Sequence, residues 1–181
     1  MVDAFYRALF APSTVALVGA SDVRGKATAR PLEFLRRHGW AGDVYPVNAK
    51  RETVLGERAF TDLRDLPSVP DHALVLTPAD AAIDAVRQCA ELGVGVATVV
   101  ADGFLPGTAD GDRRRAQLRE ILDGSRLRLL GPSSLGVATI ASGLALTGRP
   151  AGSTEAPGST ARRGSSRSTR GNSDGISVPS G

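Results

Sequence analysis

A stretch of small and basic residues at positions 19–26 could hold a negatively charged group. It contains, in order, Gly19, Ala20, Ser21, Arg24, Gly25 and Lys26. Small residues let backbone N–H groups approach an anion, and a helix that begins just after them offers its positive end. Ser21 and Arg24 stand where the dinucleotide-binding pattern has glycines, and the spacing also departs from a P-loop. The stretch indicates a phosphate-binding loop, with a plain strand-to-helix turn as the alternative.

A second polar group, at positions 48–51, bears on the kind of nucleotide. Asn48 follows an apolar run and precedes Ala49, Lys50 and Arg51. A site for NAD would place an acidic residue here to hold the ribose hydroxyls, and this group contains none. Lys50 and Arg51 instead suit a phosphorylated ribose, as in coenzyme A with its 3′-phosphate or NADP with its 2′-phosphate. The alternative is that both are solvated loop charges.

Further segments that could line a ligand follow three later apolar runs, at positions 77–79, 101–104 and 131–136. The first consists of Thr77, Pro78 and Ala79, the second begins with Ala101 and Asp102, and the third begins with Gly131, Pro132 and Ser133. Each segment alone is ordinary turn chemistry, in which glycine and proline set the backbone angles. Together they favour a ligand crevice, because an α/β crevice is lined by the segments that follow its strands.

These segments need a scaffold that brings them to one edge. Short apolar runs occur at residues 14–19, 43–47, 72–76, 94–100 and 126–130, and segments of helical period separate several of them. This alternation predicts an α/β, Rossmann-like, doubly wound domain, with a mainly parallel five-stranded sheet and helices on both faces. Ligands bind such sheets beyond the carboxyl ends of the strands, at the switch point beside the first strand.

Three helices are expected between these strands. The clearest spans residues 79–92, where Thr77 could cap the start, Pro78 suits the first helical position and Gly93 follows the last turn. Its apolar face consists of Ile83, Val86 and Ala90. A second helix is expected at residues 110–123, with Leu118, Ile121 and Leu122 facing the sheet, and a third carries Leu32 and Leu35.

Composition excludes several classes of protein. The chain has 181 residues and a formal net charge of +3, which is too small to indicate nucleic-acid binding. No apolar run is long enough to cross a bilayer, so we expect a soluble, cytoplasmic protein without a nucleic-acid or membrane partner. The single cysteine, Cys89, and the distant His38 and His72 offer neither a disulfide nor a metal site. Residues 151–181, rich in serine, glycine and arginine, predict a disordered tail after a folded domain at 1–150.

Several short motifs occur in a specific order along residues 5–147. They are LFAPS at 9–13, VALVGAS at 15–21, GDVYPVN at 42–48, TPA at 77–79, and the pairs GP at 131–132 and LG at 135–136. In this order they resemble the CoA-binding domain of NDP-forming acyl-CoA synthetases. That family includes the α subunit of succinyl-CoA synthetase and the ADP-forming acetyl-CoA synthetases.

The resemblance implies a set of ligand contacts. The nucleotide end of CoA would lie over the first loop, with Lys50 or Arg51 near its phosphates. Residues 77–79 and Val100, Ala101 and Asp102 would line the ligand, and Gly131, Pro132 and Ser133 would lie near the pantetheine arm. Ser133 replaces the asparagine usual in the family, and Ala49 stands where many relatives have proline. In the family a second domain carries a transiently phosphorylated histidine; neither His38 nor His72 has that context, so no catalytic residue is assigned.

These observations lead to a CoA- or acyl-CoA-binding module, a truncated relative of an acid–thiol ligase that is inactive alone. One alternative is an NAD(P)-binding reductase or redox-sensing regulator, and another is a subunit that serves a separately encoded ATP-grasp ligase partner. Valine at Gly19 is expected to abolish binding and leave the fold largely intact, because a branched side chain would keep an anion away from the loop backbone.

Overall fold

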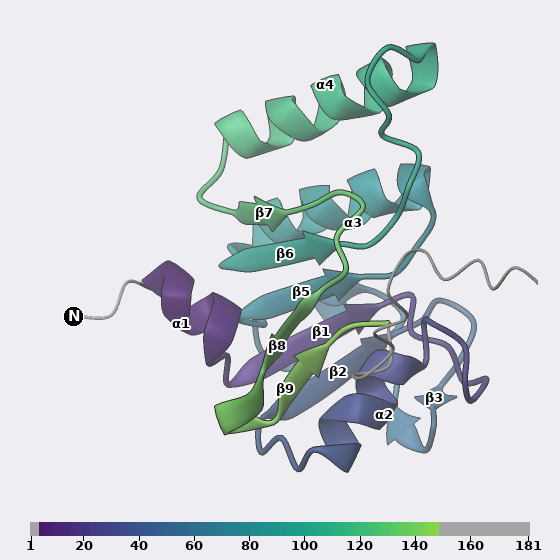
Figure 1. Ribbon diagram of the computed structural model, residues 1–181, viewed down its shortest axis with the longest axis vertical. Coiled ribbons are helices and arrows are strands. Elements are labelled where there is room, and N and C mark those ends of the chain that lie inside the picture. The colour runs from purple at the N-terminus through teal and green to yellow at the C-terminus, as the bar shows by residue number, and fades with distance from the viewer. Residues whose placement is uncertain (1–3, 149–181) are drawn as a thin grey trace, which may run out of the picture. The chain divides into compact units, whose positions relative to one another are not determined.

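Parallel pairing brings the five apolar runs into one sheet (Figure 1). The computed structural model describes residues 4–148, so the predicted tail at 151–181 lies outside the described residues. The strands are β1 (Thr14–Val18), β2 (Asp43–Val47), β5 (His72–Val75), β6 (Val96–Val99) and β7 (Arg128–Leu130), in the order β2-β1-β5-β6-β7. Every neighbouring pair is parallel. The predicted doubly wound sheet is confirmed, although β6 is shorter than the predicted run.

Helices cover both faces of the sheet, as expected from strands that are apolar on both sides. Along β1, Val15 and Leu17 pack on one face against α2 (Arg30–Arg37). Ala16 and Val18 belong to the core of the other face, which α3 (Ala79–Leu92) and α4 (Ala109–Asp123) cover. The predicted apolar faces of the three helices lie in these two cores, with Leu32 and Leu35 on α2 and Leu118 on α4 buried.

Several elements were not predicted from the sequence. Helix α1 (Ala4–Phe10) precedes β1 and packs Ala8 and Leu9 against Val96. A short hairpin, β3 (Thr53–Val54) with β4 (Glu57–Arg58), follows β2, and the 3-10 helix η1 (Leu63–Asp65) follows the hairpin. A second hairpin, β8 (Val137–Thr139) with β9 (Leu144–Leu146), encloses the 3-10 helix η2 (Ile140–Ser142) and packs on the same face as α2.

The start of α3 differs from the expected cap. Pro78 is the N-cap residue, the helix begins at Ala79, and the side chain of Thr77 makes no capping hydrogen bond. The predicted cap at Thr77 and the predicted first helical position at Pro78 are therefore wrong, because both positions lie one residue later in the chain. The Thr77 hydroxyl is instead buried, without a hydrogen-bond partner among the described residues. The expected end is confirmed, since Gly93 adopts the left-handed conformation with φ +78°.

Two titratable side chains lie inside the domain. His72, on the central strand β5, is fully buried, and its Nε2 is 2.8 Å from Thr98 Oγ1 on β6. Burial lowers the pKa of His72 from 6.5 to about 4. Cys89 on α3 is also buried, and this raises the pKa of its thiol to about 12, which makes it a poor nucleophile. Both residues thus have structural roles.

Residues 4–148 contain neither a membrane-spanning helix nor a metal cluster. None of their helices is both long and apolar enough to span a membrane. Nor does this part of the chain gather three or more His, Cys, Asp or Glu side chains in a way that could hold a metal ion.

Candidate functional site

The strand order places the switch point of the sheet between β1 and β5. The chain leaves β1 toward α2 on one face and leaves β5 toward α3 on the other. Where successive crossovers leave toward opposite faces, the loops diverge and open a crevice at the carboxyl ends of the strands. The polar segments predicted after β1, β2 and β5 all end at this edge (Figure 1).

A crevice of about 300 Å³ lies at this switch point. It brings together four of the predicted site residues, from the ends of three strands: Gly19, Asn48, Lys50 and Thr77. Its other wall comes from the exposed flank of α3 and from the segment after β4, and consists of Ala81, Asp84, Ala85, Gln88, Thr61 and Asp62. Four residues that the sequence analysis singled out therefore lie together in this crevice, and the contribution of α3 was not predicted.

Gly19, directly after β1, lies close to Thr77, which follows β5. Its φ is +84°, and a Cβ atom here would lie 2.7 Å from Thr77 Cγ2 and 3.2 Å from the Thr77 backbone nitrogen. Its own N–H donates to the Val47 carbonyl oxygen at 2.8 Å and so is not available to an anion. The expectation that valine at this position would leave the fold intact is wrong, because the glycine is required for packing between strand ends.

Most backbone N–H groups of the loop at residues 19–26 already have a hydrogen-bond partner within the protein. Ala20, Ser21 and Lys26 donate their N–H groups to carbonyl oxygens of residues 17, 28 and 23. The Val23 N–H is bound by the Ser21 hydroxyl at 3.1 Å. Within the described residues, the N–H groups of Asp22, Arg24 and Gly25 remain without a partner, beside the exposed side chains of Arg24 and Lys26. Fewer N–H groups of this loop are thus free to bind an anion than the sequence predicted.

Asn48 connects two of these loops. Its Nδ2 donates to the Ala20 carbonyl oxygen at 2.8 Å, and its Oδ1 accepts the N–H of Lys50 at 2.9 Å. Its backbone N–H donates to Phe60 O, also at 2.8 Å. The amide is therefore engaged in fixing the start of the loop after β1 and the backbone that carries Lys50. These bonds give Asn48 a positioning role at the crevice.

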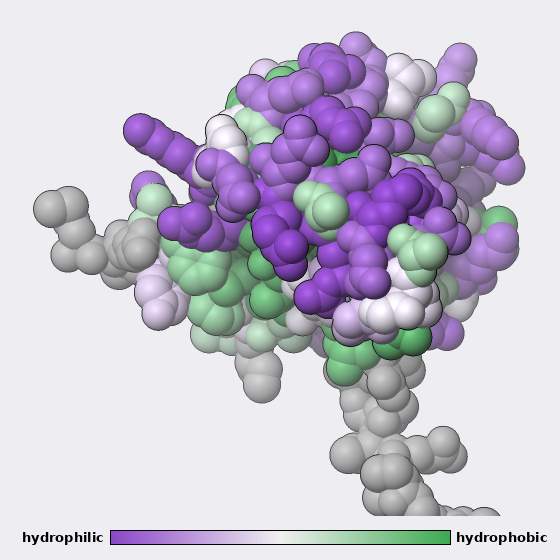
Figure 2. Space-filling view, turned by 90° about the horizontal axis from the view of Figure 1, so that it is seen from above, coloured by the Kyte–Doolittle hydropathy of each residue, from purple (hydrophilic) through white to green (hydrophobic). Residues whose placement is uncertain are grey.

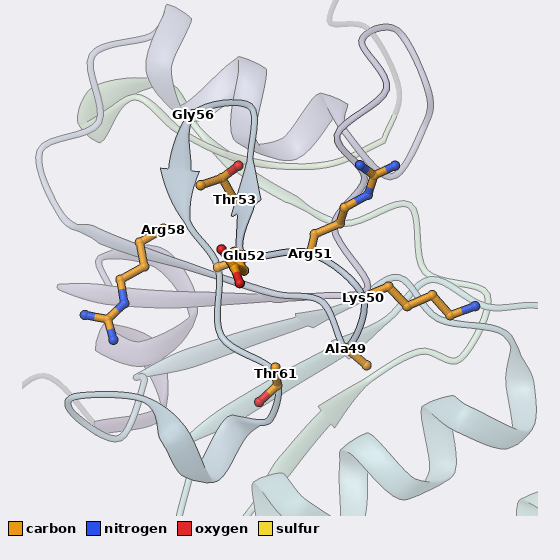
Figure 3. Close-up of a pocket in the computed structure, with 9 residues that line it drawn as sticks. Ala49, Lys50, Arg51, Glu52, Thr53, Gly56, Arg58 and Thr61 are labelled. Atoms are coloured by element: carbon orange, nitrogen blue, oxygen red, sulfur yellow. The ribbon is translucent and has the colours of Figure 1, made fainter.

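Lys50 and Arg51 are exposed cations without an ion-pair partner in residues 4–148. A second cavity of about 760 Å³, between this segment and the β3–β4 hairpin, shares Lys50 with the crevice and adds Arg51 and Arg58. Figure 3 shows Lys50 and Arg51 extending to the same side, whereas Arg58 extends to the opposite side. Arg58 lies over the Phe60 ring at 5.1 Å. Of the three cations that line this cavity, Lys50 and Arg51 are therefore the two that extend to one side.

The remaining predicted segments form a separate cavity of about 460 Å³ at the ends of β6 and β7. It is lined by Asp102 together with Gly131, Pro132 and Ser133 from the predicted set, and by residues 103–106 and Arg115. The N–H of Ser133 donates to the Ala101 carbonyl oxygen at 3.1 Å, so the two loops are bonded to each other. The Gly131–Pro132 peptide is cis.

Four other predicted site residues take part in burial, strand pairing or helix capping. Ala20 and Ala79 are buried, Val100 donates its N–H to the Val75 carbonyl oxygen at 3.1 Å, and Pro78 caps α3. Their side chains do not line the crevices described above. They hold the strand ends and loops in place.

Arg114 was missed by the sequence analysis. Its Nε and one terminal nitrogen bind the two carboxylate oxygens of Asp80 at 2.8 and 2.9 Å, and the other donates to the Gly103 carbonyl oxygen at 3.0 Å. These contacts tie the start of α3 and the loop after β6 to α4. The bond from Arg114 holds the pKa of Asp80 below its ordinary value. The partners lie 34 positions apart in the chain, so no local sequence pattern indicates this pair.

Comparison with known proteins decides between the nucleotide classes. Residues 13–140 match the family described as "CoA binding domain". The chain belongs to the CoA-binding domain family. Coenzyme A is accordingly the ligand or substrate of this domain, which resembles the N-terminal domain of ADP-forming acetate and acyl-CoA ligases. None of the matches described below is to a nicotinamide-dependent protein, and the NAD(P) alternative has no support.

Relatives of this CoA-binding domain are much longer proteins. A trans-feruloyl-CoA synthase from an unknown prokaryotic organism is 34% identical over 71% of this chain, which covers 18% of that relative. The ADP-forming acetate–CoA ligase II of Archaeoglobus fulgidus is 30% identical over 72% of this chain and 20% of its own length. The α subunit of the ADP-forming acetate–CoA ligase I of Pyrococcus furiosus is 32% identical over 72% of this chain and 29% of the subunit.

Solved structures agree with this assignment. A crystal structure of a Pyrococcus horikoshii OT3 protein superposes with a TM-score of 0.73 and 30% identity, and covers 78% of this chain and 32% of that one. Acetyl-coenzyme A synthetase 1 of Ca. Korarchaeum cryptofilum, in complex with phosphate and ADP, gives a TM-score of 0.73 at 26% identity, over 81% and 31% of the two chains.

Proposed function

We propose that CoA lies along the carboxyl edge of the sheet, with its nucleotide end at the β1–β2 side. The 3′-phosphate would bind Lys50 and Arg51, and the pantetheine arm would run toward Gly131, Pro132 and Ser133. The observation that carries this proposal is the pair of cations, both unpaired in the described residues and directed to one side beside the switch-point crevice. A guanidinium and an ammonium together suit a phosphate dianion.

Removal of the 3′-phosphate from the ligand tests this placement. We expect CoA to bind at least about tenfold more tightly than dephospho-CoA, because each charge-assisted hydrogen bond contributes about 1.5–3 kcal/mol and 1.4 kcal/mol is tenfold in affinity. The double variant Lys50→Gln, Arg51→Gln should bind both ligands equally. Isothermal titration calorimetry measures these affinities.

The matched control for this experiment is Arg58→Gln, which removes a cation that points away from the pair. It should keep the preference for CoA. Equal affinities of the unaltered chain for CoA and dephospho-CoA would place the 3′-phosphate elsewhere, and tighter binding of NADP would revive the rejected nucleotide class.

We further propose that the domain presents CoA to an acid–thiol ligase whose nucleotide-handling parts lie on other segments or on a separately encoded partner subunit. Support comes from the relatives, of which this chain matches 18–29%, one of them being named as an α subunit. In the proposed reaction a carrier on the partner transfers phosphate from a nucleoside triphosphate to the carboxylic acid, and the CoA thiol then attacks the resulting acyl phosphate and releases inorganic phosphate. No cysteine lines the switch-point crevice among the described residues, and the domain would only hold and orient CoA. A single buried cysteine suits the cytoplasm, where this ligase would act.

The isolated chain should therefore not make acyl-CoA. With ATP or GTP, Mg²⁺, CoA and short carboxylic acids, we expect no product above background by liquid chromatography, because His72 is buried and Cys89 is buried and protonated. A partner that carries an ATP-grasp unit should restore turnover. Robust synthesis by the chain alone would contradict the proposal.

A further inference from the structure

Three consecutive arginines on α4 have different surroundings. Arg113 forms an ion pair with Asp110 at 3.1 Å and lies 3.6 Å from Asp80. Arg114 is bound by Asp80 and Gly103, as described above. The side chain of Arg115 is exposed, and its guanidinium forms no ion pair or hydrogen bond in the described part of the chain. It is also the one of the three that lines a cavity.

That cavity, at the ends of β6 and β7, has both polar and apolar walls. Phe104 is buried beneath it, and Leu105, Pro106 and Pro132 supply further apolar wall. Its charged side chains are Arg115 and Asp102, which form no ion pair with each other. An unpaired guanidinium beside apolar walls favours a ligand with an aliphatic part and an anionic end.

The walls of the cavity are held by protein contacts and need no ligand to form. Arg114 fixes the Gly103 carbonyl oxygen, and Ser133 binds Ala101 across the two loops. Figure 2, which views the molecule from the α4 side, shows a mostly hydrophilic face over this helix. A pre-formed site keeps the ordering cost of binding low.

The position of this cavity relates it to the proposed CoA site. β7 lies three strand positions from β1 and four from β2, which corresponds to roughly 14–19 Å across the sheet. A CoA molecule whose nucleotide end lies at Lys50 would direct its thiol end, which carries the acyl group, toward β6 and β7. The acyl group would then reach the cavity that contains Arg115.

We propose that Arg115 makes this domain selective for acyl groups that end in a carboxylate, an inference that rests on the proposed CoA placement. The guanidinium would donate two N–H groups to the terminal carboxylate, while the aliphatic part of the acyl chain lies against Pro106 and Pro132. Asp102, in the same cavity, repels a carboxylate and so confines it to the side of Arg115. Uncharged acyl groups gain nothing from this arginine.

Glutaryl-CoA and pentanoyl-CoA, which match in carbon number, test the inference by calorimetry. We expect glutaryl-CoA to bind about tenfold more tightly, as one charge-assisted bond at an exposed site predicts. Arg115→Gln should bring the two affinities together and leave the affinity for free CoA unchanged, and Arg115→Lys should retain part of the preference. Arg119→Gln, one turn further along α4, is the matched control and should keep the full preference.

The outcomes separate this inference from the proposed function. Equal binding of glutaryl-CoA and pentanoyl-CoA, or a preference for glutaryl-CoA that persists in Arg115→Gln, would overturn the role of Arg115. The proposed CoA placement would still stand if the unaltered chain prefers CoA to dephospho-CoA. Loss of the CoA over dephospho-CoA preference in the unaltered chain would remove the placement and the inference together.

Discussion

Gly19→Val is expected to lower the free energy of unfolding by roughly 2–6 kcal/mol, since backbone strain and overpacking each contribute about 1–3 kcal/mol. The strain arises because a β-branched residue rarely adopts φ +84°, and the overpacking arises because its Cβ would meet the side chain and backbone of Thr77. Domains of this size are stable by about 5–15 kcal/mol, so the variant would lose a large part of its stability. Urea denaturation followed by circular dichroism measures the change.

Gly25→Val provides the matched control for this experiment. Gly25 lies in the same loop and has a similar φ of +80°, but a Cβ there meets nothing within 4 Å. The control should therefore show only the strain, about 1–3 kcal/mol. Equal destabilisation of the two variants would contradict a close contact between the ends of β1 and β5. Loss of ligand binding in Gly19→Val carries no information about the anion site unless the variant is shown to be folded.

Acidification is expected to destabilise the domain through His72. Its pKa is lowered from 6.5 to about 4 in the folded state, so the unfolded chain binds the proton more tightly. The stabilisation is fully present above pH 6.5 and is lost as the pH falls from 6.5 toward 4, by about 3 kcal/mol in total. The physical cause is burial of the imidazole between β1 and β6, where a positive charge would lose its hydration.

Denaturant titrations at a series of pH values between 7 and 5 measure this slope with little interference from carboxylates. His72→Gln retains a hydrogen-bonding group for Thr98 and should remove most of the slope in that window. His38→Gln is the matched control, because His38 is the second of the two histidines and lies at the exposed end of α2. A slope that persists in His72→Gln would assign it to another group.

The sequence predicted the sheet well because buried parallel strands are short apolar runs with a strong local signal. Val15 to Leu17 and Ala73 to Val75 are apolar at every position, since both faces are covered. The β8–β9 hairpin was not predicted because each strand has only three residues. The apolar side chains of β9 pack in the same core as α2, which is distant in the sequence. Helix α1 is a single short element whose buried face, Ala8 and Leu9, is too small to show a period.

The candidate site was predicted in part for a similar reason. Segments after β1, β2 and β5 could be assigned to one edge by topology alone, and they do meet there. Topology did not reveal which polar groups were already engaged, such as the Gly19 N–H with Val47 and the amide of Asn48 with Ala20. The Arg114–Asp80 ion pair could not be predicted from the sequence because it depends on how α3 packs against α4.

The placement of β1 inside the sheet governs the order in which the chain can fold during synthesis. β1 needs β2 on one side and β5 on the other, and its pairing with β5 joins Val15 to His72. A nascent chain that ends before residue 75 leaves one hydrogen-bonding edge of β1 open, next to the apolar side chains of Leu17 and Val18. Such non-local parallel pairing is slow because the intervening loop must close first. Early nascent chains of this domain therefore expose an aggregation-prone edge that is shielded only when β5 emerges from the ribosome.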